Sequence, residues 1–107
     1  MKLPIPIQAY FDADRQGDGQ AVAATFQPGA VVRDEGRTHA GRAAIRAWWE
    51  DAKARTPHVA DPLEAVSDGS TTTVRARVSG AFPGSPVVLS FAFRLEEDCI
   101  SALEITP

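Results

Sequence analysis

Two side chains that can move or stabilise charge, a carboxylate and a phenol, occur among apolar residues. Asp34 ends residues 30–34 (AVVRD), whose alternation is typical of a strand, and it shares a face with Val32. If that face is buried, the carboxylate lies in an apolar setting, which suits proton transfer near neutral pH. The alternative is an aspartate at a strand end that faces water.

Tyr10 follows Ile7 by three residues, the spacing of an apolar helical stripe. A buried phenol needs a hydrogen-bond partner, and in a cavity it can donate to a substrate oxygen. The alternative is a core tyrosine that bonds a neighbouring protein group. Asp14 lies one turn further along, either at the mouth of the same pocket or as an exposed acid at the helix end.

His39 and two adjacent tryptophans are further candidates. If His39 faces the pocket, it can pair with Asp34 or act as a second acid or base, because imidazole changes charge near neutral pH. The alternative is a strand-end histidine at the rim. Trp48 and Trp49 point about 100° apart on a helix, so one is expected to face the core or pocket, and the other a rim or a partner subunit. Simple core packing of both is the alternative.

The spacing of apolar residues changes along the chain from helical to alternating, and it predicts the helices and strands that position these side chains. Helical spacing predicts helices over 5–16, 19–26 and 42–55, with Gly17 ending the first and Asp18 capping the second. A turn is expected at Pro28-Gly29. Alternation predicts strands over 30–34, 59–67, 71–80, 87–95 and 99–106, with a short return strand within 35–39. Helices that cover one face of a mostly antiparallel sheet make an α+β fold.

Composition narrows the class of protein. The chain has 107 residues, the length of one domain spanning 1–107, and a net charge of −3 argues against a nucleic-acid binder. We expect no membrane span, because no apolar run is long enough, and no signal peptide. One cysteine and two histidines without a recognised spacing predict neither a disulfide nor a metal site. A cytoplasmic protein is therefore expected.

Three segments carry a resemblance to a known family: residues 10–18 (YFDADRQGD), 26–34 (FQPGAVVRD) and 39–45 (HAGRAAI). Together they resemble the SnoaL-like branch of the nuclear transport factor two-like superfamily, which includes ketosteroid isomerases and polyketide cyclases. The resemblance implies a cone-shaped, strongly curved and mostly antiparallel sheet. It also implies about three N-terminal helices packed on the concave face around a pocket.

The resemblance also implies roles for individual residues. Tyr10 falls at the tyrosine that donates to the oxyanion in ketosteroid isomerases, and Asp34 falls at their general base. Phe91 stands where those isomerases carry a second, protonated acid, so that half of the oxyanion site is absent. Besides the candidate catalytic residues Asp34, Tyr10 and His39, we expect the pocket to be lined by Asp14, Val32, Trp48, Phe91 and Phe93.

Two functions are compatible with these residues. The first is a proton transfer of the isomerase, cyclase or dehydratase type on a small apolar carbonyl compound, without a metal or cofactor. The second is a non-catalytic dimeric module that binds a ligand or a protein. An open pocket with Tyr10 and Asp34 within reach of one ligand atom favours the first. A pocket filled by protein side chains, with the two residues far apart, favours the second. The family resemblance also predicts a homodimer formed through the outer face of the sheet.

Overall fold

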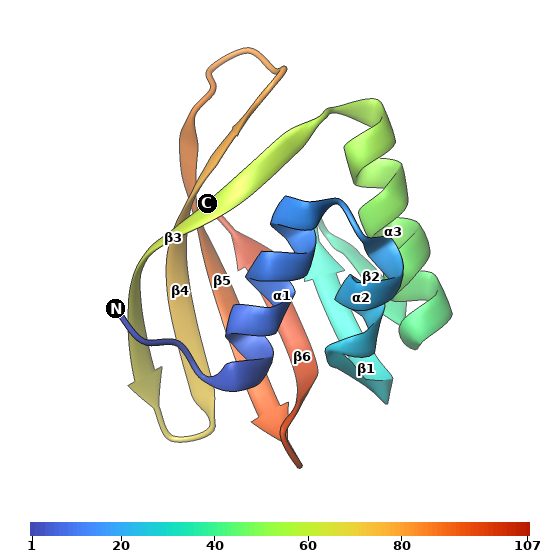
Figure 1. Ribbon diagram of the computed structural model, residues 1–107, viewed down its shortest axis with the longest axis vertical. Coiled ribbons are helices and arrows are strands. Elements are labelled where there is room, and N and C mark those ends of the chain that lie inside the picture. The colour runs from blue at the N-terminus through green and yellow to red at the C-terminus, as the bar shows by residue number, and fades with distance from the viewer.

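Three helices lie against one face of a six-stranded sheet in the computed structural model, which describes residues 1–107 (Figure 1). In chain order the elements are α1 (Ile5–Gln16), α2 (Gly19–Ala24), β1 (Phe26–Asp34), β2 (Arg37–Ala40), α3 (Arg42–Arg55), β3 (His58–Asp68), β4 (Thr71–Gly80), β5 (Val87–Glu96) and β6 (Cys99–Thr106).

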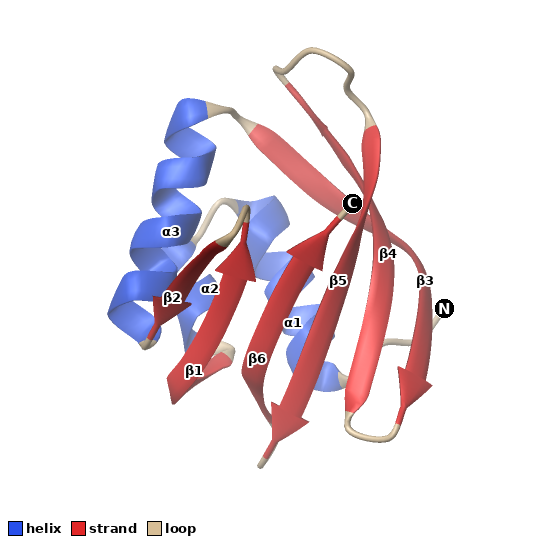
Figure 2. Ribbon diagram, turned by 180° about the vertical axis from the view of Figure 1, so that it is seen from behind, coloured by secondary structure: helices blue, strands red, loops and turns tan.

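The sheet has the strand order β2-β1-β6-β5-β4-β3. Strands β1 and β6 are parallel, and all other neighbours are antiparallel. Figure 2 shows the sheet from its outer side, with the helices behind it. A curved, mostly antiparallel sheet with helices on its concave face confirms the predicted α+β cone.

The break between α1 and α2 falls at Gly17 and Asp18, as predicted. Gly17 adopts a left-handed conformation with φ of 71°, which a side chain would strain, and ends α1. The Asp18 side chain then accepts a 3.1 Å hydrogen bond from the backbone N–H of Ala21, so it caps α2. The chain therefore turns sharply between the two helices, and α1 lies across the sheet (Figure 1).

The predicted end of α2 and the predicted turn at Pro28-Gly29 are wrong. The second helix stops at Ala24, and Phe26 already belongs to β1, where it pairs with Ile100 of β6. Pro28 and Gly29 lie inside this strand, at a shift in its register with β6 between Phe26 and Val31. Pairing with a strand distant in sequence therefore overrides the local turn signal.

Strand β3 bends as its proline suggests. Its register with β4 shifts between Pro62 and Glu64, and β3 is an edge strand, where a missing backbone donor is tolerated. Asp68 and Gly69, a residue pair typical of tight hairpins, lie where the chain turns back into β4.

The core lies between the helices and the concave face of the sheet. Ile7 and Phe11 of α1 pack against residues that alternate inward along the strands, such as Val32 and Phe93. On β4 the inward residues Val74, Ala76 and Val78 are buried. None of the three helices combines the length and the apolarity that crossing a membrane requires.

Candidate active site

A cavity of about 410 Å³ lies between α1, α3 and the concave face of the sheet. Eleven of its eighteen lining residues are hydrophobic, so a ligand inside it meets mainly apolar surface. Tyr10 and Asp34 both line it. The cavity is open to solvent and is not filled by protein side chains.

Asp34 is the last residue of β1 and lies half-buried in the cavity wall. Strand pairing fixes its position, because its neighbours are Ile105 on β6 and Arg37 on β2. Its Oδ2 accepts a 3.1 Å hydrogen bond from the indole nitrogen of Trp48 on α3. No other protein group donates to this carboxylate, so its remaining lone pairs are free to receive a proton.

Tyr10 points from α1 toward the sheet and is only 2% exposed. Phenylalanine rings hold it edge-on, with centroids 5.2 Å away at Phe11, 6.0 Å at Phe26 and 5.4 Å at Phe93. Its hydroxyl makes no hydrogen bond with a protein group, yet no fully buried side-chain polar atom lacks a partner. The hydroxyl is therefore open to the cavity that it lines.

The electrostatic setting of Tyr10 keeps its phenol protonated. Burial raises the pKa of Tyr10 well above its ordinary value, and the negative charges of Asp14 and Asp34 raise it further. A phenol in this state donates a hydrogen bond and does not act as a base at neutral pH. Tyr10 and Asp34 both line the cavity, so the phenol and the carboxylate face the same mainly apolar space.

Asp14 is buried at 5% exposure, so its interpretation as an exposed helix-end acid is wrong. Its Oδ1 accepts a 2.9 Å hydrogen bond from the Trp49 indole and lies 2.7 Å from the ammonium of Lys53. Its Oδ2 accepts a 3.2 Å hydrogen bond from the backbone N–H of Ala60. The need to pair a buried charge explains why three donors surround this carboxylate.

The two tryptophans differ from the expectation that one lies at a rim or faces a partner subunit. Trp48 and Trp49 are both buried and both line the cavity. Their indole nitrogens point to different carboxylates, Asp34 and Asp14. The two side chains leave α3 in different directions, as predicted, but both rings form part of the cavity wall.

The other expected site residues occupy three kinds of position. Phe91 lines the cavity, with Leu89 beside it on β5. Val32 and Phe93 are fully buried in the core and are not among the lining residues. His39 pairs with Val32 across β1 and β2, and its ring lies 6.0 Å from that of Trp48. It is not a lining residue and reaches the cavity only through Trp48.

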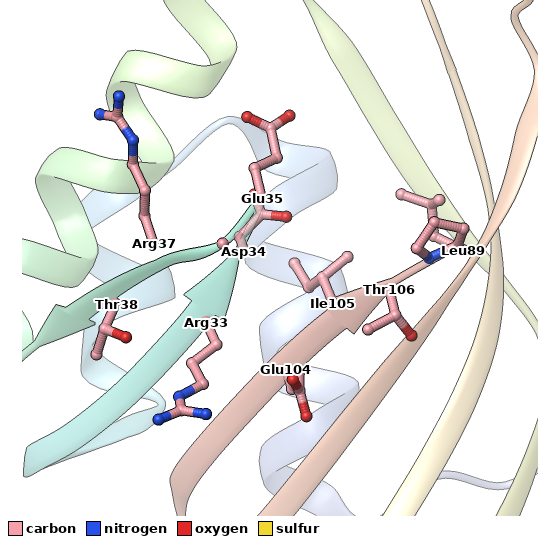
Figure 3. Close-up of a pocket in the computed structure, with 11 residues that line it drawn as sticks. Arg33, Asp34, Glu35, Arg37, Thr38, Leu89, Glu104, Ile105 and Thr106 are labelled. Atoms are coloured by element: carbon pink, nitrogen blue, oxygen red, sulfur yellow. The ribbon is translucent and has the colours of Figure 1, made fainter.

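A larger, polar groove of about 670 Å³ lies where β1 and β6 end (Figure 3). Leu89 and Ile105 are its two hydrophobic residues, and both also line the cavity, as do Asp34 and Glu35. The groove and the cavity therefore meet at Asp34.

No group of three histidine, cysteine, aspartate or glutamate side chains is placed to hold a metal ion. The polar groups that line the cavity include the half-buried carboxylate of Asp34, the phenol of Tyr10 and the Asp14–Lys53 pair, together with Glu35, Arg55, Thr56 and His58. Such groups serve general acid–base chemistry.

Sequence reasoning missed Lys53. Its position four residues after Trp49 on α3 places both side chains on one helix face, and this spacing was the available signal. Lys53 was overlooked because a lysine on an amphipathic helix usually faces water. Its role depends on Asp14, 39 positions earlier in the chain, and only the fold brings the two together.

The model of the SnoaL-like domain matches residues 7–100 of this chain. A structure of a protein proposed to be a polyketide cyclase, from Sinorhizobium meliloti, is 49% identical to it, with a TM-score of 0.94. That match covers 97% of this chain and 95% of the other. No curated protein matches the sequence significantly.

More distant structures share the fold. A protein from Catenulispora acidiphila with a ketosteroid isomerase-like fold, solved with trimethylamine, is 19% identical and has a TM-score of 0.88, covering 99% of this chain and 87% of that one. The epoxide hydrolase/cyclase-like enzyme SalBIII, which acts in pyran ring formation in the polyether salinomycin, is 18% identical with a TM-score of 0.81. That match covers 95% of this chain and 87% of SalBIII. At these identities the likeness concerns the fold alone.

Proposed function

The chain belongs to the SnoaL-like domain family, and from this premise we propose that its cavity binds a small apolar carbonyl compound and transfers a proton within it. The reaction is of the isomerase, cyclase or dehydratase type and needs no cofactor. One observation carries the proposal: Tyr10 and Asp34 line the same mainly apolar cavity. The similarity to a protein proposed to be a polyketide cyclase supports it.

The two carboxylates of the site differ in their hydrogen bonding, and this difference assigns the base. Asp14 is occupied by Trp49, Lys53 and the backbone of Ala60, whereas Asp34 has one donor, Trp48. A base needs a free lone pair within reach of the substrate. Asp34 meets this condition and takes the proton, while Asp14 belongs to the structural wall.

Tyr10 supplies the second part of the reaction. When Asp34 removes a proton from the carbon beside the carbonyl, the C–H electron pair moves to form an enolate, and negative charge builds on the oxygen. The protonated Tyr10 hydroxyl donates a hydrogen bond to that oxygen in a site of low polarity, where such a bond is strong. Phe91 supplies apolar surface and no proton, so Tyr10 stabilises the oxygen without a second acid.

Asp34 then returns the proton. When the enolate is conjugated to a C=C bond, delivery to the far carbon of that system gives isomerisation. When the enolate carbon instead attacks a second carbonyl of the same molecule, the new C–C bond closes a ring and Asp34 gives its proton to the alkoxide that forms. In this scheme His39 is a positioning residue, because it touches Trp48, which in turn holds Asp34. Asp34 and Tyr10 are the catalytic residues.

The test uses β-tetralone, a bicyclic apolar ketone with an acidic proton beside the carbonyl. Exchange of that proton in deuterium oxide is followed by NMR, and binding is followed by tryptophan fluorescence, because both tryptophans of the chain line the cavity. We expect Asp34→Asn to lose at least about 100-fold in exchange rate, the usual contribution of a general base, while still binding the ketone. Asp12→Asn, on the exposed side of α1, is the matched control.

Binding of β-tetralone without any exchange that depends on Asp34 contradicts the proposal. That result instead identifies the protein as the non-catalytic binding module.

We also propose that two copies associate through the outer face of the sheet. Val66 and Val88 are exposed there, 67% and 39% respectively, and they pair with Thr73 and Arg77, which alternate with the buried residues of β4. Light scattering should give a mass twice that of the 11.4 kDa chain. A mass equal to one chain contradicts the dimer.

A further inference from the structure

The ammonium group of Lys53 is held in the cavity wall by two fixed acceptors. Its Nζ lies 2.7 Å from Oδ1 of Asp14 and donates a 2.7 Å hydrogen bond to the backbone oxygen of His58. The nitrogen also lies 5.4 Å from the centre of the Trp49 ring. These contacts leave its side chain 17% exposed, among the residues that line the cavity. Lys53 is therefore a positioned donor and not a mobile surface charge.

An ammonium group has three N–H donors, and only two of those of Lys53 meet protein acceptors. Buried donors are normally satisfied. Because Lys53 lines the cavity, the third donor is available to an acceptor that enters it. A ligand with an oxygen at this place completes the coordination of the ammonium.

The charged residues around Lys53 determine which kind of ligand oxygen can bind to its ammonium group. Asp14 and Lys53 together are neutral, and the other charged residues of the lining are Asp34, Glu35 and Arg55, so acids outnumber bases by three to two. A carboxylate on the ligand would meet the like charge of Asp14 in a site of low polarity, where repulsion is strong. A carbonyl, ether or hydroxyl oxygen accepts the same hydrogen bond without that repulsion.

The position of the second oxygen follows from α1. Tyr10 and Asp14 are four residues apart, so their backbones are separated by about 6 Å along the helix axis. Lys53 binds Asp14, and the carbonyl that reacts is placed at Tyr10 in the proposed function. The second oxygen thus lies about one helical turn from the reacting carbonyl, on the side of α3.

We propose that the ligand of this cavity is an apolar ketone with a second, neutral oxygen, and that Lys53 is the residue that selects it. This inference rests on the proposed function for the location of the first carbonyl and deepens it by naming the substrate class. Lys53 binds the second oxygen and takes no part in the proton transfer at Asp34.

The test compares ligands that differ at one group. One β-tetralone carries an acetyl group on its aromatic ring, at the end far from the ketone, and the other carries an isopropyl group of the same heavy-atom number. Calorimetry gives both dissociation constants. One hydrogen bond to a charged group predicts about tenfold tighter binding of the acetyl compound. A carboxylate at the same position should bind more weakly than the acetyl group.

Two variants assign the preference to Lys53. In Lys53→Met the ratio of the two dissociation constants should fall to about one. Because that change leaves Asp14 buried without its cation, the double variant Asp14→Asn with Lys53→Met provides a neutral pair and should show the same loss of preference. Arg46→Gln removes one positive charge from the solvent side of the same helix and should keep the tenfold ratio.

Equal binding of the acetyl and isopropyl compounds by the unchanged protein overturns the inference, as does a preference that survives both Lys53 variants. Tighter binding of the carboxylate overturns the neutral-oxygen assignment. These outcomes are read from binding alone. If exchange of β-tetralone depends on Asp34 while the preference is absent, only this inference fails. If the preference is present without exchange, only the proposed reaction fails.

Discussion

The indole nitrogen of Trp48 donates a 3.1 Å hydrogen bond to Oδ2 of Asp34. The next residue in the chain, Trp49, donates instead to Asp14. Adjacent residues on α3 thus hold the two carboxylates of one cavity, because their side chains leave the helix about 100° apart. Asp34 is kept in place by a single donor, and Asp14 is enclosed by three.

Trp48→Phe should slow proton exchange of β-tetralone by about tenfold or more. The phenyl ring keeps most of the packing but loses the N–H that orients Asp34, and one hydrogen bond to a charged group accounts for a change of this size. NMR exchange rates measured over a range of ketone concentrations separate this effect from binding. The maximal rate should fall more than the apparent affinity.

Trp49→Phe is the matched control for this prediction. It removes the neighbouring indole N–H, which serves Asp14 and not Asp34. The exchange rate of this variant, expressed per folded molecule, should stay within about twofold of that of the unchanged protein. Its free energy of unfolding should fall by about 1–3 kcal/mol. If both variants lose exchange equally, the hydrogen bond to Asp34 has no special role.

Tyr10 is the one tyrosine of the chain, so its ionisation can be followed by absorbance without interference from a second phenol. Burial, followed by the charges of Asp14 and Asp34, raises the pKa of Tyr10 well above its ordinary value. The folded protein should therefore show no tyrosinate absorbance at pH values where the denatured chain already titrates, near pH about 10. Titration of the folded protein at its ordinary pKa contradicts the buried placement.

The same raised pKa has a consequence for stability. Above pH about 10 the unfolded phenol releases its proton while the folded one retains it, so the folded state binds more protons. The stability contributed by the protonated phenol is fully present below that pH and is lost as the pH rises toward the folded-state pKa. The free energy of unfolding should decrease by up to about 1.4 kcal/mol per pH unit relative to Tyr10→Phe, measured by urea denaturation.

Asp14→Ala should destabilise the protein by about 3–5 kcal/mol. The change leaves the ammonium of Lys53 without its counter-charge and removes the acceptor of the Trp49 indole. Asp12→Ala, on the exposed side of the same helix, should change stability by no more than about 0.5 kcal/mol. Urea denaturation of both variants measures the difference. Equal effects contradict the burial of an ion pair at Asp14.

The order and type of the elements could be predicted because each depends on residues close together in sequence. Gly17 and Asp18 end one helix and begin the next by local hydrogen bonds, and the inward alternation of Val74, Ala76 and Val78 marks β4. The start of β1 could not be predicted, since it depends on pairing of Phe26 with Ile100, 74 residues away.

The site divides in the same way. Asp34 and Tyr10 were identified from their local pattern and from the family resemblance. Asp14 was expected to line the pocket, and it does. Its burial among three donors from α3 and β3 was not expected, because no local pattern reveals those donors. His39 has the right chemistry for the site, but its register opposite Val32 places it behind Trp48.

Gly80→Ala should loosen the wall of the cavity where β4 approaches the start of β3. A Cβ at this position would lie 2.6 Å from Cβ of His58 and would also contact the backbone oxygen of Pro57. Both neighbours belong to the paired backbone of the α3–β3 junction, so the chains must separate, at a cost of about 1–3 kcal/mol. His58 and Phe82, on either side of the contact, line the cavity, so binding of β-tetralone should weaken as well.

Gly29→Ala is the matched control, because its new Cβ meets no atom within 4 Å, and it should leave stability unchanged or slightly raised. Urea denaturation measures the stability of the two variants, and calorimetry measures their binding of β-tetralone. If Gly80→Ala is as stable as Gly29→Ala, the close approach of β4 to Pro57 and His58 is contradicted.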